Sequence, residues 1–124
     1  MRFYKASANT GTHVGSLWAA DGTLLGEANF TGETASGWQT ATFATPVPVT
    51  AGTLYVASYL APNGHYSATP AAFASNPVVN PPLSAFANGT ALNGVYRYSA
   101  TAAYPSSSWN STNYWVDVLF APAS

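Results

Sequence analysis

Residues 14–30 read VGSLWAADGTLLGEANF, and this stretch decides the fold class. Two apolar, strand-like runs flank Asp21-Gly22, a dipeptide that favours the tight turn of a β-hairpin. The spacing predicts β-strands over residues 14–20 and 23–30, joined by a two-residue type I′ turn. A hairpin of this kind is the strongest local signal in the chain, and it indicates an antiparallel β-structure.

The sequence on both sides continues this pattern of short strands separated by turns. Further strands are predicted over residues 38–44, 53–60, 94–99 and 114–120, which are rich in aromatic and β-branched residues. Pro, Gly, Ser, Thr and Asn recur too often for the apolar periodicity of a helix to persist. We therefore expect residues 1–124 to form a single all-β domain, an antiparallel β-sandwich of about eight strands and of the jelly-roll or immunoglobulin-like type.

The core of this sandwich is expected to be aromatic. The chain has no Ile, but it has four Trp, eight Tyr and six Phe among 124 residues. Most rings of a sandwich are buried, and the residues that we place in the core are Trp18, Trp38, Phe43, Tyr55, Val56, Val116, Val118 and Phe120. Residues 68–93 lack a regular period and are expected to form an ordered or functional surface loop.

Charge is scarce, and this excludes several kinds of partner. Three Lys and Arg residues are too few for a nucleic-acid footprint, and no apolar run is long enough to span a membrane. We therefore expect no nucleic acid partner and no membrane insertion. The absence of Cys excludes disulfides and thiolate zinc sites. A surface solvated by hydroxyls and amides suggests a secreted, extracellular protein.

Catalytic chemistry finds little support in the residues. A glycosidase needs two carboxylates held across a cleft, and nothing places together any two of Asp21, Glu27, Glu33 and Asp117. A Gly-x-Ser-x-Gly nucleophile motif is missing. His13 and His65 with a carboxylate could hold a metal, but a turn histidine that bonds backbone is the simpler interpretation. The expectation is a protein that is not an enzyme, with no metal and no cofactor.

Asp117 has a structural explanation of its own. It lies between Val116 and Val118 and so faces away from both. We expect it to form an ion pair with Arg2, Lys5 or Arg97, which are the only cations of the chain.

Three groups of aromatic residues fit the core less well than the others do. They are His65-Tyr66, Tyr96-Arg97-Tyr98 and the stretch from Trp109 to Trp115. Each combines rings with Asn, Ser or Arg in or beside a loop, and sugar recognition uses that combination. The apolar C–H face of a pyranose lies on a ring, while amides, hydroxyls and guanidinium groups bind its hydroxyls.

The candidate ligand-binding residues are accordingly Asn63, His65, Tyr66, Arg97, Tyr98, Trp109, Asn113 and Trp115. A second interpretation stays open for Tyr96 and Tyr98. Alternate residues of a strand point to the same face, so this pair would also fit the core face of a strand, with Arg97 on the opposite side.

Six segments of the chain match a known family. They are residues 2–5 (RFYK), 9–18 (NTGTHVGSLW), 33–39 (ETASGWQ), 61–66 (APNGHY), 93–96 (NGVY) and 113–118 (NYWVDV). These segments cover almost the whole chain and keep the motif order of the family. The chain therefore resembles the bacterial domain of unknown function 4082. The resemblance implies a module of a large secreted or surface protein, and it assigns no catalytic residue.

The resemblance also bears on the beginning of the chain. Members of the family usually carry a further stretch, which we interpret as one or two strands, before the segment that matches residues 2–5. A sandwich without these strands would leave a sheet edge with unpaired backbone groups. Such a chain could dimerise by strand addition, swap a segment or aggregate. Among these outcomes we expect a concentration-dependent homodimer formed through the open sheet edge.

These observations favour a non-catalytic accessory module of a secreted bacterial protein. It would bind a polysaccharide or a cell-surface glycan weakly through its loop aromatics. The alternative is a structural or adhesive spacer domain with no small-molecule ligand, whose aromatic residues all belong to the core.

Overall fold

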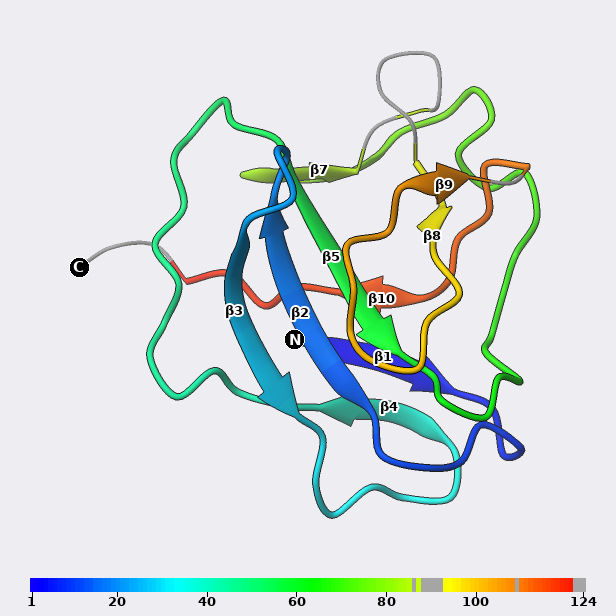
Figure 1. The fold of residues 1–124 in the computed structure, drawn as a ribbon. Coiled ribbons are helices and arrows are strands. Elements are labelled where there is room, and N and C mark those ends of the chain that lie inside the picture. The colour runs from blue at the N-terminus through cyan, green and yellow to red at the C-terminus, as the bar shows by residue number, and fades with distance from the viewer. Residues whose placement is uncertain (86, 88–92, 109, 122–124) are drawn as a thin grey trace.

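The computed structural model describes residues 1–85, 87, 93–108 and 110–121. In this part of the chain it has ten β-strands and no helix (Figure 1). The strands are β1 (Arg2–Lys5), β2 (Val14–Ala19), β3 (Leu24–Asn29), β4 (Gly37–Thr40), β5 (Tyr55–Leu60), β6 (Val78–Asn80), β7 (Leu83–Ala85), β8 (Val95–Tyr96), β9 (Ser107–Ser108) and β10 (Val116–Asp117).

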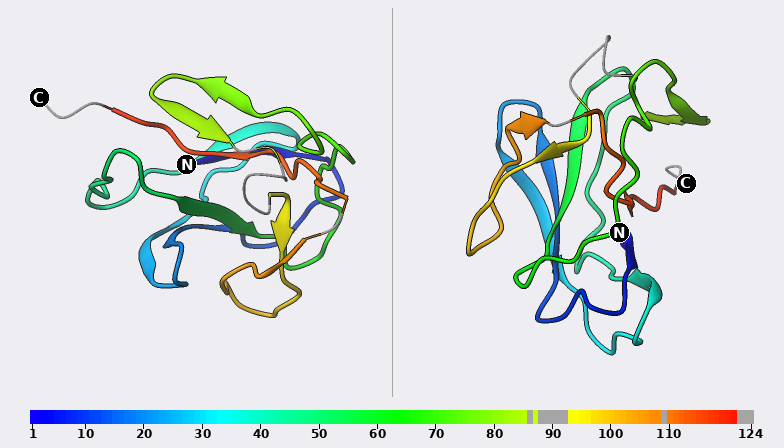
Figure 2. Two further views of the ribbon diagram at one scale, coloured as in Figure 1. Left: turned by 90° about the horizontal axis from the view of Figure 1, so that it is seen from above. Right: turned by 90° about the vertical axis from the view of Figure 1, so that its right-hand side faces the viewer.

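Two antiparallel sheets of three strands form the two layers. One has the order β10-β1-β4 and the other the order β3-β2-β5. The right-hand view of Figure 2 shows the second sheet on one side of the molecule and the first sheet on the other. The predicted all-β antiparallel sandwich is therefore confirmed. Two further sheets of two strands, β6-β7 and β8-β9, lie outside these layers.

The predicted hairpin is present, but its turn is of another kind. Strands β2 and β3 pair from Val14↔Asn29 onward, and the N–H of Gly22 donates to the carbonyl of Ala19 (3.0 Å). Of the turn pair only Gly22 has a positive φ, 92°, whereas a type I′ turn needs a positive φ at both central residues. The connection is instead a longer loop in which Gly22 takes the left-handed position. Its geometry is fixed by Asp21, whose carboxylate accepts the N–H of Thr23 (2.9 Å).

The core lies between the two sheets and is largely aromatic, as expected. Phe3 is fully buried in the central strand β1. Its ring stacks on Tyr59 with centroids 4.3 Å apart and meets the edge of Phe30 at 4.8 Å. Partly buried side chains that pack against this cluster are Phe43, Ala57, Tyr59 and Val116. Trp18 is buried as predicted, and its indole N–H donates to Ser58 Oγ (2.8 Å).

Two of the predicted core residues are wrong, because Trp38 is 42% exposed and Phe120 is 40% exposed. In β4 the inward residue is Gln39, which pairs with Phe3 of β1. Its amide is needed by the preceding loop: Oε1 accepts the N–H of Thr34 (2.9 Å) and Nε2 donates to Thr34 Oγ1 (2.7 Å). Since neighbouring strand residues point to opposite faces, Trp38 must lie outside. Tyr55, Val56 and Val118 are partly buried.

The segment 68–93 is more regular than predicted. It contains the hairpin of β6 and β7, with the register Val78↔Ala85 to Asn80↔Leu83. A hairpin that packs on little other structure needs no regular spacing of apolar residues. Val78 and Val79 of this hairpin are indeed exposed. Residues 86 and 88–92 of this segment lie outside the described residues.

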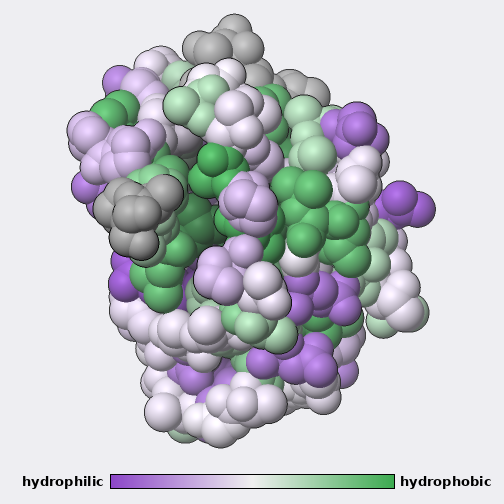
Figure 3. Space-filling view, turned by 90° about the vertical axis from the view of Figure 1, so that its left-hand side faces the viewer, coloured by the Kyte–Doolittle hydropathy of each residue, from purple (hydrophilic) through white to green (hydrophobic). Residues whose placement is uncertain are grey.

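One face of the domain carries a group of exposed apolar side chains. Figure 3 shows apolar side chains gathered across the middle of this face, which is the left-hand side of Figure 1. That side carries β3, the segment between β4 and β5, and the chain after β10. The exposed large apolar side chains of these segments are Leu24, Leu25, Val49, Leu54, Leu119 and Phe120.

Candidate functional site

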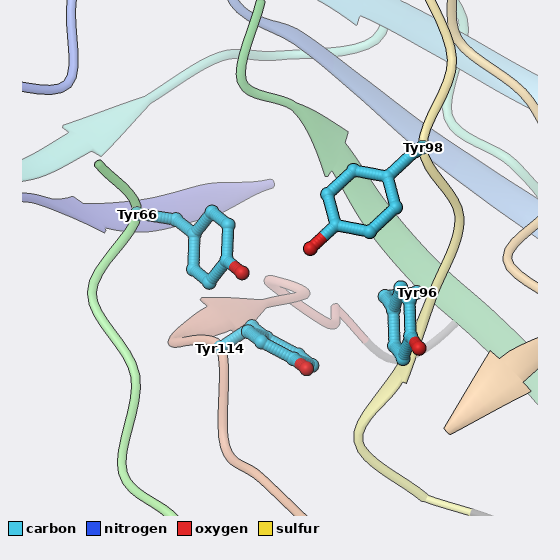
Figure 4. Close-up of a pocket in the computed structure, with 4 residues that line it drawn as sticks. All are labelled: Tyr66, Tyr96, Tyr98 and Tyr114. Carbon is cyan, nitrogen blue, oxygen red and sulfur yellow. The ribbon is translucent and has the colours of Figure 1, made fainter. Parts of the chain in front are cut away.

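Four tyrosine rings from three distant segments surround a hollow of about 320 Å³, which we call the tyrosine hollow. They are Tyr66, Tyr96, Tyr98 and Tyr114 (Figure 4). Tyr66 follows β5, Tyr96 and Tyr98 come from β8 and the residues after it, and Tyr114 precedes β10. The predicted candidates Tyr66 and Tyr98 are thus brought together.

The rings of the tyrosine hollow meet edge to face. Ring centroids are 5.3 Å apart for Tyr66 and Tyr114, 5.6 Å for Tyr96 and Tyr98, and 6.4 Å for Tyr96 and Tyr114. Edge-to-face contacts are favourable for aromatic pairs. Tyr98 is 82% exposed and Tyr66 is 41% exposed, so the hollow opens to solvent.

The phenol groups of the tyrosine hollow interact with one another. Figure 4 shows the hydroxyls of Tyr66 and Tyr98 facing each other across the space. Interaction with the hydroxyl of Tyr98, together with burial, raises the pKa of Tyr66 above its usual value of 10.0. Burial raises the pKa of Tyr114 as well. Tyr66 and Tyr114 therefore present neutral phenols, which can both donate and accept hydrogen bonds.

Two local features bring these rings together. Asn113 and Thr69 exchange backbone hydrogen bonds of 2.9 and 2.8 Å, which holds the Tyr114 segment beside the segment of Tyr66. Gly94 has a φ of 69°, and a side chain there would collide with the backbone of Thr112. Only glycine allows this close approach, which carries β8 toward Tyr114.

A second hollow of about 320 Å³ lies against the outer face of the sheet β10-β1-β4. We call it the tryptophan hollow; its lining residues are Tyr4, Trp38, Ser67, Ala68 and Trp115. Tyr4 and Trp38 are cross-strand partners with ring centroids 5.4 Å apart, and the ring centroids of Trp38 and Trp115 are 6.5 Å apart. Sequence reasoning missed both residues: it assigned Trp38 to the core, and it saw Tyr4 only as part of a strand-like segment.

A charged pair borders the tryptophan hollow. The guanidinium of Arg2 lies 4.4 Å from the ring centre of Trp38, and it forms an ion pair with Asp117 at 3.3 Å. Among the three cations considered for Asp117, Arg2 is therefore the partner.

The other predicted site residues have different positions. The amide of Asn63 donates to Thr10 Oγ1 (3.1 Å), so it anchors its own turn. His65 is exposed with a φ of 59° and does not line either hollow. Asn113 lines neither hollow; its Oδ1 accepts the N–H of Trp115 (2.7 Å) and so helps to hold Trp115 in place. Arg97 is exposed and has no hydrogen bond or ion pair with a described residue. Trp109 lies outside the described residues.

A buried polar cluster was not predicted. His13 is fully buried, with Nδ1 2.9 Å from the carboxylate of Glu33 and Nε2 2.8 Å from Asn9 Oδ1. Lys5 Nζ lies 3.2 Å from Glu33. The interpretation of His13 as a turn histidine bonded to backbone is therefore wrong, because the side chains of Glu33 and Asn9 hold its ring. Because Glu33 lies 20 positions after His13 in the sequence, no local signal reveals the cluster.

Residues 1–85, 87, 93–108 and 110–121 contain no group of three or more His, Asp or Glu side chains that could hold a metal ion. Within the same ranges there is no helix of the length and apolar character that a membrane crossing requires.

A family model described as "Domain of unknown function (DUF4082)" matches residues 1–116. The chain belongs to this family. The resemblance inferred from its six segments is therefore confirmed. The match covers every ring of the tyrosine hollow and of the tryptophan hollow, so both lie inside the DUF4082 domain. No curated protein and no solved structure matches this DUF4082 domain.

Proposed function

We propose that this DUF4082 domain is a non-catalytic accessory module of a secreted bacterial protein, and that it binds carbohydrate weakly through the tyrosine hollow. The observation that carries the proposal is the open arrangement of Tyr66, Tyr96, Tyr98 and Tyr114 around a space of about 320 Å³. This volume is at the small end of ligand pockets, which span roughly 300–1,000 Å³. It suits one or two sugar units of a polysaccharide or a cell-surface glycan.

The chemistry of the lining supports a sugar. Aromatic faces accept the C–H face of a pyranose, and phenols exchange hydrogen bonds with its hydroxyls. Arg97 is exposed between Tyr96 and Tyr98 but is not among the residues that line the hollow. In this proposal its guanidinium donates to a part of the glycan that extends beyond the rings. The four lining residues carry phenols and no carboxylate, which favours binding over hydrolysis.

The spacer interpretation requires that the aromatic residues belong to the core. The exposure of Tyr98 at 82% favours the binding interpretation instead. The secreted, bacterial setting is part of the same proposal, and the very low charge of the chain supports it.

We also propose a homodimer through an open sheet edge. Strand β1 is paired on both sides, so the edge strands of the two layers are β10, β4, β3 and β5. Edge strand β3 carries the exposed Leu24 and Leu25 on the apolar side described above. A second copy paired along β3 would satisfy backbone groups and cover these side chains.

Affinity electrophoresis tests the binding proposal. Native gels would contain hydroxyethylcellulose, laminarin, xylan or galactomannan. We expect at least one of them to slow the unchanged domain, and Tyr98→Ala to remove most of that effect. Phe120→Ala is the matched control, because Phe120 is an exposed ring that lines neither hollow. Equal mobility in all four gels and in a plain gel would refute the proposal.

A further inference from the structure

We propose that the tryptophan hollow is a second sugar-binding site, and that the ligand of this domain is a neutral polysaccharide long enough to reach both hollows. The inference rests on the proposed function and names the class of its ligand. It is carried by Tyr4, Trp38 and Trp115, three exposed rings around one space of about 320 Å³.

The position of these rings is not needed for the core. Tyr4 and Trp38 lie on the face of the sheet opposite to Phe3 and Gln39. A cluster of large rings on an outer face exposes apolar surface to water, which marks a binding site more often than a structural feature.

Trp115 is held rigidly in an uncommon conformation. Its φ is 58°, in the left-handed region that bulky residues rarely adopt. Its N–H donates to Asn113 Oδ1 (2.7 Å) and its indole Nε1–H to Thr69 Oγ1 (2.9 Å). Strain maintained by surrounding hydrogen bonds is typical of functional sites. A ring fixed before binding loses little conformational freedom when a sugar stacks on it.

Polar groups complement the apolar faces of this hollow. The indole N–H of Trp38 and the hydroxyl of Tyr4 have no partner among the described residues, and both side chains reach solvent. They are therefore available to hydroxyls of a sugar. Among the described residues, the charged group found against these rings is Arg2, which lies 4.4 Å from the ring centre of Trp38 and is already paired with Asp117 at 3.3 Å. A balanced pair does not favour an anionic ligand, so a neutral sugar fits better than a uronic acid.

The two hollows are neighbours. Consecutive residues line different hollows at two places, Tyr66 with Ser67 and Tyr114 with Trp115. The backbone between them is held by the pairing of Thr69 with Asn113. A monosaccharide can fill only one hollow, whereas a polysaccharide can occupy both. Two weak sites on one module strengthen retention on a polymer through effective concentration, without tighter binding of short sugars.

Nuclear magnetic resonance of the tryptophan indole N–H groups tests this inference. The titrants are cellotetraose, laminaritetraose, xylotetraose and mannotetraose. With a tetrasaccharide of the polysaccharide that slows the domain, we expect the Trp38 signal to move in the unchanged domain and in Tyr98→Ala. The buried indole of Trp18, bonded to Ser58, is the internal control and should not move.

Gel retardation by the polymer supplies the second readout. Trp38→Ala and Tyr98→Ala should each weaken the apparent affinity for the polymer by about tenfold or more, and the double variant should abolish it. Trp38→Phe, which keeps a ring, should retain most of the affinity. An unchanged Trp18 signal in every variant shows that each is folded.

Other outcomes separate the two proposals. Retardation that depends on Tyr98, with a Trp38 signal that never moves, overturns the second site and leaves the proposed function standing. Retardation that depends on Trp38 alone overturns the role of the tyrosine hollow and, with it, the two-site ligand. Stronger retardation in polygalacturonate than in every neutral gel overturns the neutral ligand. No retardation in any gel overturns both proposals.

Discussion

Tyr4 and Trp38 face each other across β1 and β4 with ring centroids 5.4 Å apart, on the outside of the sandwich. The next pair inward along the same strands, Phe3 and Gln39, points into the core. One pair of strands thus supplies the centre of the core on one face and part of a candidate binding site on the other. Stability and binding can therefore be separated by substitution.

Phe3→Ala and Trp38→Ala should differ strongly in their effect on the free energy of unfolding. Loss of the fully buried ring of Phe3 should cost about 3–5 kcal/mol. Trp38→Ala should cost about 1 kcal/mol, because the contacts that it loses, with Tyr4, Trp115 and Arg2, all lie on the exposed face of the sheet. Chemical denaturation of both variants measures the difference. Equal losses would contradict the assignment of the two faces.

The buried cluster around His13 should be sensitive to a neutral substitution. Glu33→Gln removes the negative charge that faces both His13 and Lys5. We expect a loss of about 2 kcal/mol, as for hydrogen bonds to charged groups. Glu27→Gln on the exposed side of β3 is the matched control and should change stability by less than about 0.5 kcal/mol. If the two variants denature at the same urea concentration, the cluster contributes nothing.

Stability should fall at alkaline pH because of Tyr59. Burial raises the pKa of Tyr59 to about 12, from 10.0 for an ordinary phenol. Above about pH 10 the unfolded chain loses this proton while the folded chain keeps it, so the folded state binds more protons and stability decreases as pH rises. The contribution is complete below pH 10 and is lost between about pH 10 and pH 12, on the order of 2 kcal/mol.

Denaturation of the unchanged domain and of Tyr59→Phe between about pH 9 and pH 12 measures this dependence. Phenylalanine cannot ionise, so the variant should lose less stability over the range. An identical slope for both proteins would show that Tyr59 does not titrate as expected.

Self-association should depend on concentration. Edge strand β3 and the apolar side chains beside it offer a surface for a second copy, and the low charge of the chain provides little repulsion. Sedimentation velocity from micromolar to millimolar protein should show a monomer that converts to a dimer. Leu24→Lys should shift this equilibrium toward monomer, since a charged edge opposes pairing, whereas Tyr98→Ala should not. A monomer at every concentration would rule out the dimer.

Much of the fold follows from local patterns in the sequence. Asp21-Gly22 between two apolar runs was enough to place the hairpin, and the density of turn residues excluded helices. Such patterns could not predict which face of β4 points into the core. A shift by one residue exchanges the two faces of a strand, and the decisive fact is the hydrogen bonding of Gln39 to Thr34, which no periodicity reveals.

The candidate site was predictable only in part. Tyr96 and Tyr98 are close in sequence, so their shared face could be anticipated. The meeting of Tyr66 with Tyr114 depends on the pairing of Thr69 with Asn113, residues far apart in the chain. Contacts between residues far apart in the chain decide where the exposed rings come together, and no local sequence pattern predicts such contacts.

The central claim is that sugars bind to the rings of the two hollows, and carbon-labelled tyrosine side chains test it most directly. The domain with ¹³C-tyrosine would be titrated with the four tetrasaccharides named above, and the ring signals of its eight Tyr residues followed. We predict that at least one tetrasaccharide shifts the signals of Tyr66, Tyr96, Tyr98 and Tyr114, together with Tyr4, while those of Tyr55 and Tyr59 stay in place. Signals that remain unchanged with all four sugars, or shifts that spare the hollows, would contradict the account.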